Sequence, residues 1–250
     1  MIEQEVEIPT PEGVSGGVLY LPEGGGPWPG MLFLTDIGGI RRPNRDMARR
    51  VAEQGFVVLM PNVFYRTGKP PLFAFPFVPG EARSLERLAE LSSPLTAQAM
   101  ERDAIAYLDF LSSLGSVRSG GMAVVGYCFT GAMALRTAAA RPDHIATAVS
   151  FHGGRLVTDA ATSPHLVLPR VKARLYFGHA CNDGSMPAEA IARLDTALTT
   201  WGGVYQSEVY EGARHGWTVP DSPAYNQPQA ERAFGKLAAL LRETLQPAGR

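Results

Sequence analysis

Cysteine is scarce in this sequence, since only Cys128 and Cys181 occur among 250 residues. They form no CxxC pair, which excludes a disulfide framework. A single bond between them stays open, although a reducing cytosol disfavours it.

A strong charge bias and long apolar runs are also missing. The chain has 23 Lys and Arg against 24 Asp and Glu, so we expect no nucleic-acid partner and no electrostatic binding to membranes. No segment approaches the roughly 20 apolar residues of a membrane span. Residues 1–7 lack the basic and apolar regions of a signal peptide, which predicts a cytoplasmic protein.

The composition that remains is that of an ordinary globular protein, with 45% hydrophobic and 19% charged residues. The length fits one domain over residues 1–250. Apolar runs alternate with helical patterns, which predicts an α/β fold with a mostly parallel sheet, helices on both faces and an antiparallel hairpin at one edge. The expected strands are 5–8, 16–21, 30–35, 56–61, 122–126, 145–151, 173–177 and 204–210, and the expected helices are 43–54, 81–91, 95–114, 187–201 and 224–245, besides one after Cys128.

Residues 64–94 interrupt this alternation with proline, glycine and aromatic residues. Irregular insertions between strands often cover an active site. We interpret this one as a cap in which Phe73 and Phe75 wall a substrate pocket. The alternative is that both rings only anchor the loop to the core.

Cys128 follows the apolar run 122–126 and precedes small residues at helical spacing. This pattern is typical of a strand that enters a helix through a tight turn, which exposes a nucleophile. The backbone N–H of the next residue, Phe129, then assists the attack. Gly126 and Gly131 permit the close approach. Taken alone, the pattern also fits a buried structural thiol.

Two later strand ends carry the groups that such a nucleophile needs. Asp183 lies 55 residues after Cys128, and His215 lies 32 residues after Asp183. The carboxyl ends of parallel strands gather at one edge of a sheet. The order nucleophile, acid, histidine is the order of an α/β-hydrolase.

With these three segments the chain resembles the dienelactone hydrolase family, and the resemblance covers nearly its whole length. The combination is specific, although no single segment is. The similar segments are Gly126-Tyr127-Cys128 with Gly131, Asp183-x-x-Met186-Pro187, Gly212-Ala213-x-His215-Gly216, and Arg45-Asp46-x-Ala48 with Ala52-Glu53-x-Gly55 and Pro61.

The resemblance implies an α/β-hydrolase fold and cleavage of a lactone or ester through a thioacyl intermediate. It implies Cys128 as nucleophile, His215 as general base and then acid, and Asp183 as the carboxylate that orients the imidazole. It also implies an oxyanion hole from the backbone N–H groups of Ile37 and Phe129. We expect no cofactor and no metal, a small-molecule substrate, and a monomer or small homo-oligomer.

Three positions depart from the family pattern. Asp36 stands where members that cleave dienelactone have a glutamate that helps to activate the cysteine, so it is a candidate thiol activator or a cap of the next turn. Val219 stands where such members present an arginine to the substrate, and Thr130 replaces a glycine. Basic residues that could replace the missing arginine are Arg41, Arg42 and Arg83.

Two other functions remain open. The first is a broad carboxylesterase or thioesterase, because four aromatic side chains would favour an apolar acyl group. These are Phe73, Phe75, Tyr127 and Trp217. A non-catalytic binding or thiol-sensing protein is the second alternative, although it has no need for the acid and the histidine.

Two further histidine patterns are interpreted as structural. His179, Cys181 and Asp183 alternate as metal ligands on a strand would, but the turn at Gly184 argues against a strand there. The segment 152–154, His-Gly-Gly, superficially resembles a lipase oxyanion motif. That motif precedes the nucleophile, so we interpret this segment as a strand-end turn.

Overall fold

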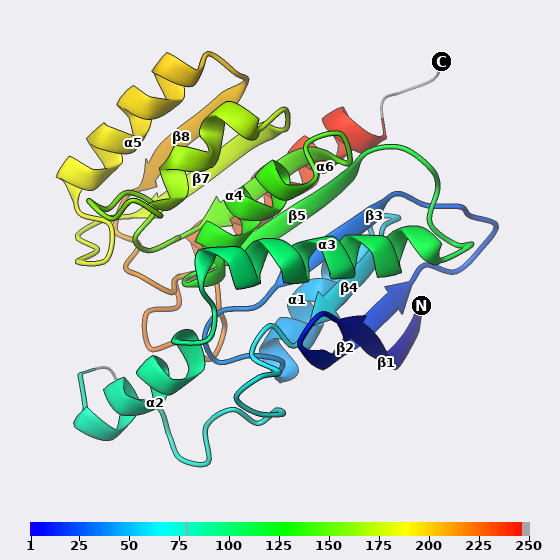
Figure 1. The fold of residues 1–250 in the computed structure, drawn as a ribbon, viewed down its shortest axis with the longest axis horizontal. Coiled ribbons are helices and arrows are strands. Elements are labelled where there is room, and N and C mark those ends of the chain that lie inside the picture. The colour runs from blue at the N-terminus through cyan, green and yellow to red at the C-terminus, as the bar shows by residue number, and fades with distance from the viewer. Residues whose placement is uncertain (79, 247–250) are drawn as a thin grey trace.

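The computed structural model describes residues 1–78 and 80–246 of the chain. Its strands are β1 (Ile2–Thr10), β2 (Gly13–Leu21), β3 (Gly30–Leu34), β4 (Val57–Pro61), β5 (Met122–Tyr127), β6 (Ile145–Phe151), β7 (Arg174–Ala180) and β8 (Tyr205–Tyr210). They form one sheet in the order β1-β2-β4-β3-β5-β6-β7-β8 (Figure 1). The pairs β1–β2 and β2–β4 are antiparallel and the other pairs are parallel. The expected mostly parallel sheet with an edge hairpin is confirmed.

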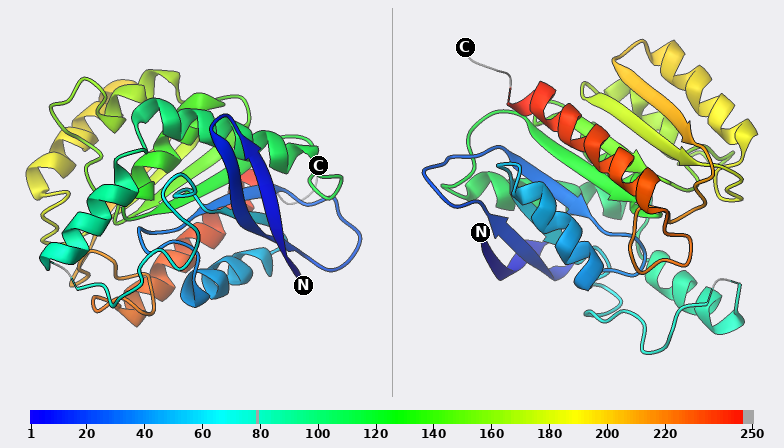
Figure 2. Two further views of the ribbon diagram at one scale, coloured as in Figure 1. Left: turned by 60° about the horizontal axis from the view of Figure 1, so that its bottom comes forward. Right: turned by 180° about the vertical axis from the view of Figure 1, so that it is seen from behind.

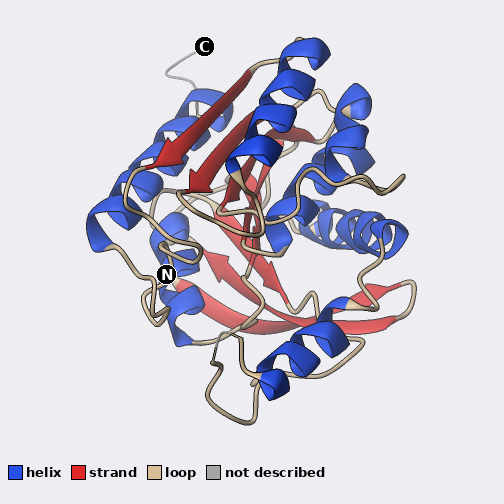
Figure 3. Ribbon diagram, turned by 90° about the vertical axis from the view of Figure 1, so that its left-hand side faces the viewer, coloured by secondary structure: helices blue, strands red, loops and turns tan. Residues whose placement is uncertain are grey.

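Helices cover both faces of this sheet. The helices are α1 (Arg42–Ala52), α2 (Ala82–Ser92), α3 (Ala97–Ser113), α4 (Thr130–Ala140), α5 (Ala188–Trp201) and α6 (Gln227–Leu245), with a 3-10 helix at Pro164–Arg170. Helices α3, α4 and α5 lie on the face seen in Figure 1, and α1 and α6 lie on the opposite face (Figure 2). Figure 3 shows the sheet between the two helical layers.

The central strands are buried on both faces because both are covered. Every residue of β3, β4 and β5 is buried, which explains why these strands are nearly continuous apolar runs. Strand β7 differs from our expectation, since it continues past residue 177 to Ala180. The reason lies in β8, which supplies partners for Gly178, His179 and Ala180.

Local signals set several helix ends. The Thr96 hydroxyl accepts a hydrogen bond from the Ala99 N–H at 3.2 Å and begins α3. Helix α6 begins later than the expected residue 224, because the Asn226 side chain caps it through the Gln229 N–H at 3.3 Å. Helix α5 ends at Gly202, whose φ of 74° is left-handed.

The strand order reverses direction at β3. From β3 the chain crosses to β4 on one side, whereas β5 lies on the other side. In open α/β sheets, ligands bind outside the carboxyl ends of the strands at such a reversal. Here the loop after β3 and the turn after β5 flank that position.

Residues 64–94 leave the sheet, and α2 stands apart from the body (Figure 1). Within this insertion the Phe73 ring packs edge-on against Phe75 at 5.8 Å and against Phe77 at 5.4 Å. Residue 79 of the insertion and residues 247–250 of the expected domain lie outside the described residues. Among the described helices, none has the length and apolarity needed to cross a membrane.

Candidate active site

Cys128 lies in the turn between β5 and α4. Its φ of 57° is left-handed, which costs a non-glycine residue about 1–2 kcal/mol. The surrounding backbone holds this conformation. The Cys128 N–H donates to the Phe151 carbonyl at 3.1 Å, and the Cys128 carbonyl accepts from the Gly131 N–H at 3.1 Å and the Gly154 N–H at 3.3 Å. The strand, turn and helix around Cys128 are therefore as the sequence predicts.

Thr130 ties this turn to the neighbouring strand. Its hydroxyl accepts from the Tyr127 N–H at 2.9 Å and lies 2.9 Å from the Leu34 carbonyl, to which it can donate. Leu34 is the last residue of β3. The threonine that departs from the family pattern thus joins the ends of β3 and β5, which a glycine could not do.

Glycine is required where β5 meets α4. A Cβ on Gly126 would lie 2.2 Å from the Thr130 carbonyl oxygen. A Cβ on Gly131 would lie 2.4 Å from the Ser150 hydroxyl and 2.7 Å from the Gly153 Cα. Real atoms do not approach so closely, so a side chain at either position must displace backbone.

We expect Gly126→Ala to destabilise the chain by about 2 kcal/mol, because overpacking of this order typically costs 1–3 kcal/mol. Urea denaturation measures the change. Gly235→Ala is the matched control, since a Cβ there meets no atom within 4 Å on α6. Alanine should stabilise that helix by up to about 1 kcal/mol. An unchanged urea midpoint for Gly126→Ala would contradict the geometry.

The structure brings the three predicted residues together. His215 Nε2 lies 3.0 Å from Cys128 Sγ, and His215 Nδ1 lies 2.6 Å from Asp183 Oδ2. The other carboxylate oxygen, Oδ1, accepts from the Ser185 N–H at 2.8 Å and the Ser185 hydroxyl at 2.7 Å. Asp183 follows β7 and His215 follows β8, so three strand ends supply one continuous chain of hydrogen bonds.

Electrostatics favour a charged imidazole in this chain. Burial opposes the charge, but hydrogen bonds to Asp183 and Cys128 outweigh it and raise the pKa of His215 to about 10. Burial would raise the pKa of Asp183, but hydrogen bonds from His215 and Ser185 lower it to about 2. At neutral pH an imidazolium therefore lies between the Asp183 carboxylate and the Cys128 sulfur.

The backbone N–H groups of Ile37 and Phe129 are available to a ligand. Both residues are half-buried, and neither N–H donates a hydrogen bond to another residue within 1–78 and 80–246. Phe129 immediately precedes α4, whose N-terminal dipole end adds positive potential. An oxyanion hole formed by these two donors, on the loops after β3 and β5, stays a prediction.

Among the described residues, Asp36 makes no hydrogen bond with Cys128. Both of its oxygens accept from Arg41, at 2.5 and 2.9 Å. Arg41 also donates to both oxygens of Asp221, at 2.8 and 2.9 Å, and to Asn44 at 2.6 Å. Arg41 therefore joins the loop that carries Ile37 to the loop that follows His215, and it is occupied rather than free for a substrate carboxylate.

We expect Asp36→Asn to destabilise the chain by about 1–3 kcal/mol, because it weakens charge-assisted hydrogen bonds from Arg41. Alkylation of Cys128 by iodoacetamide should stay within about twofold of the wild-type rate. Asp46→Asn is the control, since its ion pairs on α1 are exposed and contribute little. A tenfold slower alkylation in Asp36→Asn alone would instead make Asp36 a thiol activator.

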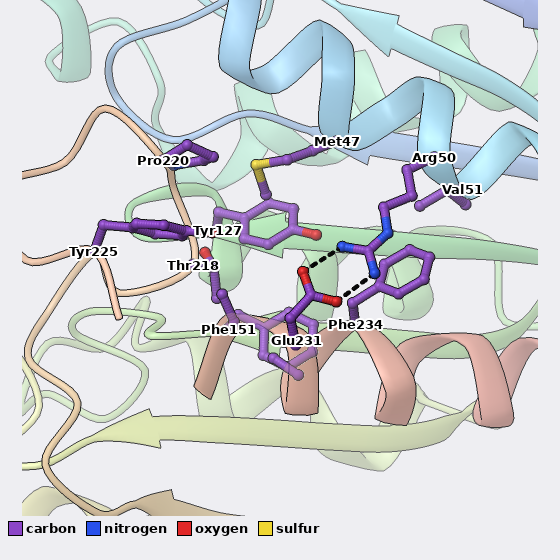
Figure 4. Close-up of a pocket in the computed structure, with 12 residues that line it drawn as sticks. Met47, Arg50, Val51, Tyr127, Phe151, Thr218, Pro220, Tyr225, Glu231 and Phe234 are labelled. Carbon is purple, nitrogen blue, oxygen red and sulfur yellow. Dashed lines mark hydrogen bonds and ion pairs between the residues drawn. The ribbon is translucent and has the colours of Figure 1, made fainter. Parts of the chain in front are cut away.

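Two predicted pocket residues lie elsewhere. Trp217 is fully buried and packs on Tyr210 at 4.8 Å, so it belongs to the core and not to a substrate wall. Tyr127 is 4% exposed and lines a cavity of about 70 Å³ between α1 and α6. In Figure 4 it lies in this cavity beside the Arg50–Glu231 ion pair, and Cys128 is not among the lining residues. Both corrections have the same cause, namely that these rings fill the α1/α6 face of the sheet.

The remaining candidates occupy the insertion, the loop after β8 and the first position of α1. Phe73 and Phe75 are half-buried in their aromatic cluster, and the Arg83 guanidinium lies over the Phe75 ring at 3.8 Å. A wall function of these two rings stays a proposal. Val219 is fully buried, and the side chain of Arg42 is 94% exposed.

Sequence reasoning missed two residues beside the nucleophile and its acid. His152 does follow β6, as expected, but it is buried and its Nδ1 accepts from the Cys128 N–H at 3.1 Å. Ser185 holds the Asp183 carboxylate. His152 could have been found from its place at the end of a strand adjacent to β5. Ser185 could have been found from the Asp-x-Ser spacing, which is typical of a turn capped by the Asp side chain.

Cys128 and Cys181 are both free thiols. Within the described part of the chain, no group of three or more His, Cys, Asp or Glu side chains could hold a metal ion. His179 is buried within β7, where burial lowers its pKa to about 4.

Comparison with known proteins gives matches over most of this chain. The model of the dienelactone hydrolase family matches residues 16–245. A carboxymethylenebutenolidase of Rhodococcus opacus is 29% identical over 199 residues, covering 78% of this chain and 73% of the relative.

Solved structures show the same fold. A crystallised protein of Klebsiella pneumoniae has a TM-score of 0.86 at 20% identity, covering 97% of this chain and 98% of that one. A dienelactone hydrolase-like promiscuous phosphotriesterase from metagenomic libraries has a TM-score of 0.82 at 22% identity, covering 98% of both chains.

Proposed function

Because this chain belongs to the dienelactone hydrolase family, we propose that it hydrolyses a lactone or ester through a thioacyl intermediate on Cys128. The observation that carries the proposal is the chain of contacts from Sγ to His215 at 3.0 Å and from His215 to Asp183 at 2.6 Å. A nucleophile, a base within hydrogen-bond reach and a group that orients the base are the parts of acyl-transfer catalysis.

In the first half of the proposed reaction, the Cys128 thiolate attacks the carbonyl carbon and the carbonyl oxygen becomes an oxyanion. The N–H groups of Ile37 and Phe129 stabilise this charge. The tetrahedral intermediate collapses by breaking the bond to the alkoxide oxygen, which takes the proton from His215. For a lactone, this alcohol stays attached to the acyl group.

In the second half, His215 takes a proton from water as the water attacks the thioester. The second tetrahedral intermediate expels the Cys128 thiolate and releases the carboxylic acid, which ionises. His215 ends the cycle protonated, and Asp183 stabilises the imidazolium throughout. Bonds and charges balance without a cofactor.

A substrate panel tests the proposal: dienelactone, a neutral lactone, and short and aromatic esters. We expect turnover of at least one compound, and a brief acid quench should trap an acyl group on the peptide that contains Cys128, seen by mass spectrometry. Because Arg41 is occupied and Val219 is buried, neutral esters and lactones should be the better substrates. Turnover with an acyl group on no cysteine would contradict the thioacyl route.

A further inference from the structure

A second histidine, His152, contacts the backbone of the proposed nucleophile, Cys128. Its ring is 4.9 Å from Trp217 and 5.2 Å from His215, and it is 1% exposed. Its backbone φ of 39° is left-handed, as is that of Cys128. Two strained residues at the ends of adjacent strands indicate a conformation that the surroundings impose.

Both ring nitrogens of His152 have partners, and these determine its tautomer. Nδ1 accepts from the Cys128 N–H at 3.1 Å, so Nδ1 carries no proton. Nε2 lies 2.8 Å from the Thr218 hydroxyl and must then carry the proton and donate it. Burial, and then the neighbouring His215, lower the pKa of His152 well below its ordinary value, which keeps the ring neutral.

We propose that His152 is a positioning residue for the nucleophile: its neutral ring, with the proton on Nε2, holds the Cys128 backbone so that Sγ faces His215. This inference rests on the proposed function, because it gives Cys128 the nucleophilic role. The Cys128 N–H is shared between His152 Nδ1 and the Phe151 carbonyl, each at 3.1 Å. The imidazole therefore supplies one of the two acceptors that fix the Cys128 N–H. The φ of Cys128 in turn sets the direction of Sγ.

The arrangement also explains why the oxyanion hole uses the next residue. The Cys128 N–H donates to His152 and Phe151, whereas the Phe129 N–H has no acceptor within residues 1–78 and 80–246. Thr218 lies three residues after His215 on the same loop. The His152–Thr218 hydrogen bond therefore connects the cysteine turn to the loop that carries the general base.

Two substitutions at residue 152 separate the two hydrogen bonds. In His152→Asn the amide oxygen lies where Nδ1 was and can accept the Cys128 N–H. In His152→Gln the longer side chain can reach Thr218 but leaves no acceptor at the Nδ1 position. We expect kcat to fall about 10- to 100-fold in His152→Gln with KM within about twofold, because misplacing a reacting group affects the chemical step. His152→Asn should stay within about threefold of the wild type.

Thr218→Val is an independent test, since it leaves residue 152 and its left-handed φ unchanged. It removes the acceptor that favours the proton on Nε2, so we expect a roughly threefold to tenfold lower kcat. Alkylation of Cys128 by iodoacetamide, in a Cys181→Ala background, should slow in the same order as kcat. Thermal unfolding verifies that each variant is folded at the assay temperature.

Equal kcat values for the folded Asn and Gln variants, or a Thr218→Val enzyme with wild-type kcat and alkylation rate, would overturn the inference while Cys128-dependent turnover persists. Turnover that survives Cys128→Ala would overturn the proposed function, and this inference with it. The two failures are thus distinguishable.

Discussion

Replacement of Cys128 by alanine should lower kcat on the best lactone or ester by about 10⁴-fold or more. The substitution removes the sulfur atom that lies 3.0 Å from Nε2 of the proposed base, His215. When the nucleophile is removed, the base and its orienting acid have no group to activate, because the three residues act as a unit. Only the oxyanion hole and substrate binding then contribute to a residual rate. The measurement is steady-state hydrolysis at saturating substrate.

The fold should tolerate this change. Alanine and cysteine are both non-glycine residues under the same left-handed constraint, and the turn is held by backbone hydrogen bonds that alanine keeps. Cys181→Ala is the matched control, because Cys181 is the other free thiol and lies outside the contact chain. We expect that control to retain wild-type kcat. Equal activity of wild type and Cys128→Ala would make the cysteine mechanism untenable.

Asp183→Asn should lower kcat by about 10³- to 10⁴-fold, the second largest effect. The carboxylate orients His215 through Nδ1 at 2.6 Å, and its hydrogen bond raises the imidazole pKa against the effect of burial. An amide supplies no charge, so the pKa of His215 should fall from about 10 towards its ordinary value. A pH titration of the His215 ring by NMR, with a parallel pH–rate profile, measures both changes.

The same substitution has a pH-dependent effect on stability. The pKa of Asp183 is about 2 in the folded chain and about 3.9 when unfolded, so its charge stabilises the fold above about pH 4. This contribution, about 2 kcal/mol, is lost as pH falls from 4 towards 2. The wild type should therefore unfold at a higher urea concentration than Asp183→Asn at pH 7, and the difference should shrink near pH 3.

A control isolates the buried carboxylate from a simple change of charge. Asp159→Asn removes an exposed aspartate that pairs with Arg193, so its stability should change little at either pH. A constant difference between wild type and Asp183→Asn from pH 7 to pH 3 would show that the Asp183 charge does not stabilise the fold.

Most of the fold follows from the sequence because its signals are local. Alternating apolar runs and helical patterns predicted the sheet. The differences lie at element ends and in the 3-10 helix at Pro164–Arg170, which was not expected. Strand β7 was expected to end at residue 177, but pairing with β8 extends it to Ala180. Such an end depends on a partner strand that local composition does not reveal.

The candidate site, like the fold, was predicted from the sequence only in part. The sequence by itself determined the order of Cys128, Asp183 and His215, each directly after a parallel strand, and strand ends of a parallel sheet meet at one edge. Chain order therefore predicts which groups meet, and the observed contacts of 3.0 and 2.6 Å agree with it.

Only the tertiary structure decided what the flanking side chains contact. Arg41 binds both Asp36 and Asp221, which is 180 residues away in the sequence, so the candidate thiol activator is held by an arginine instead. Trp217 is buried in the core and His152 is bonded to the nucleophile's backbone. Periodicity encodes which face of an element is buried, whereas the partner of a polar or aromatic side chain depends on which loops the strand order makes neighbours.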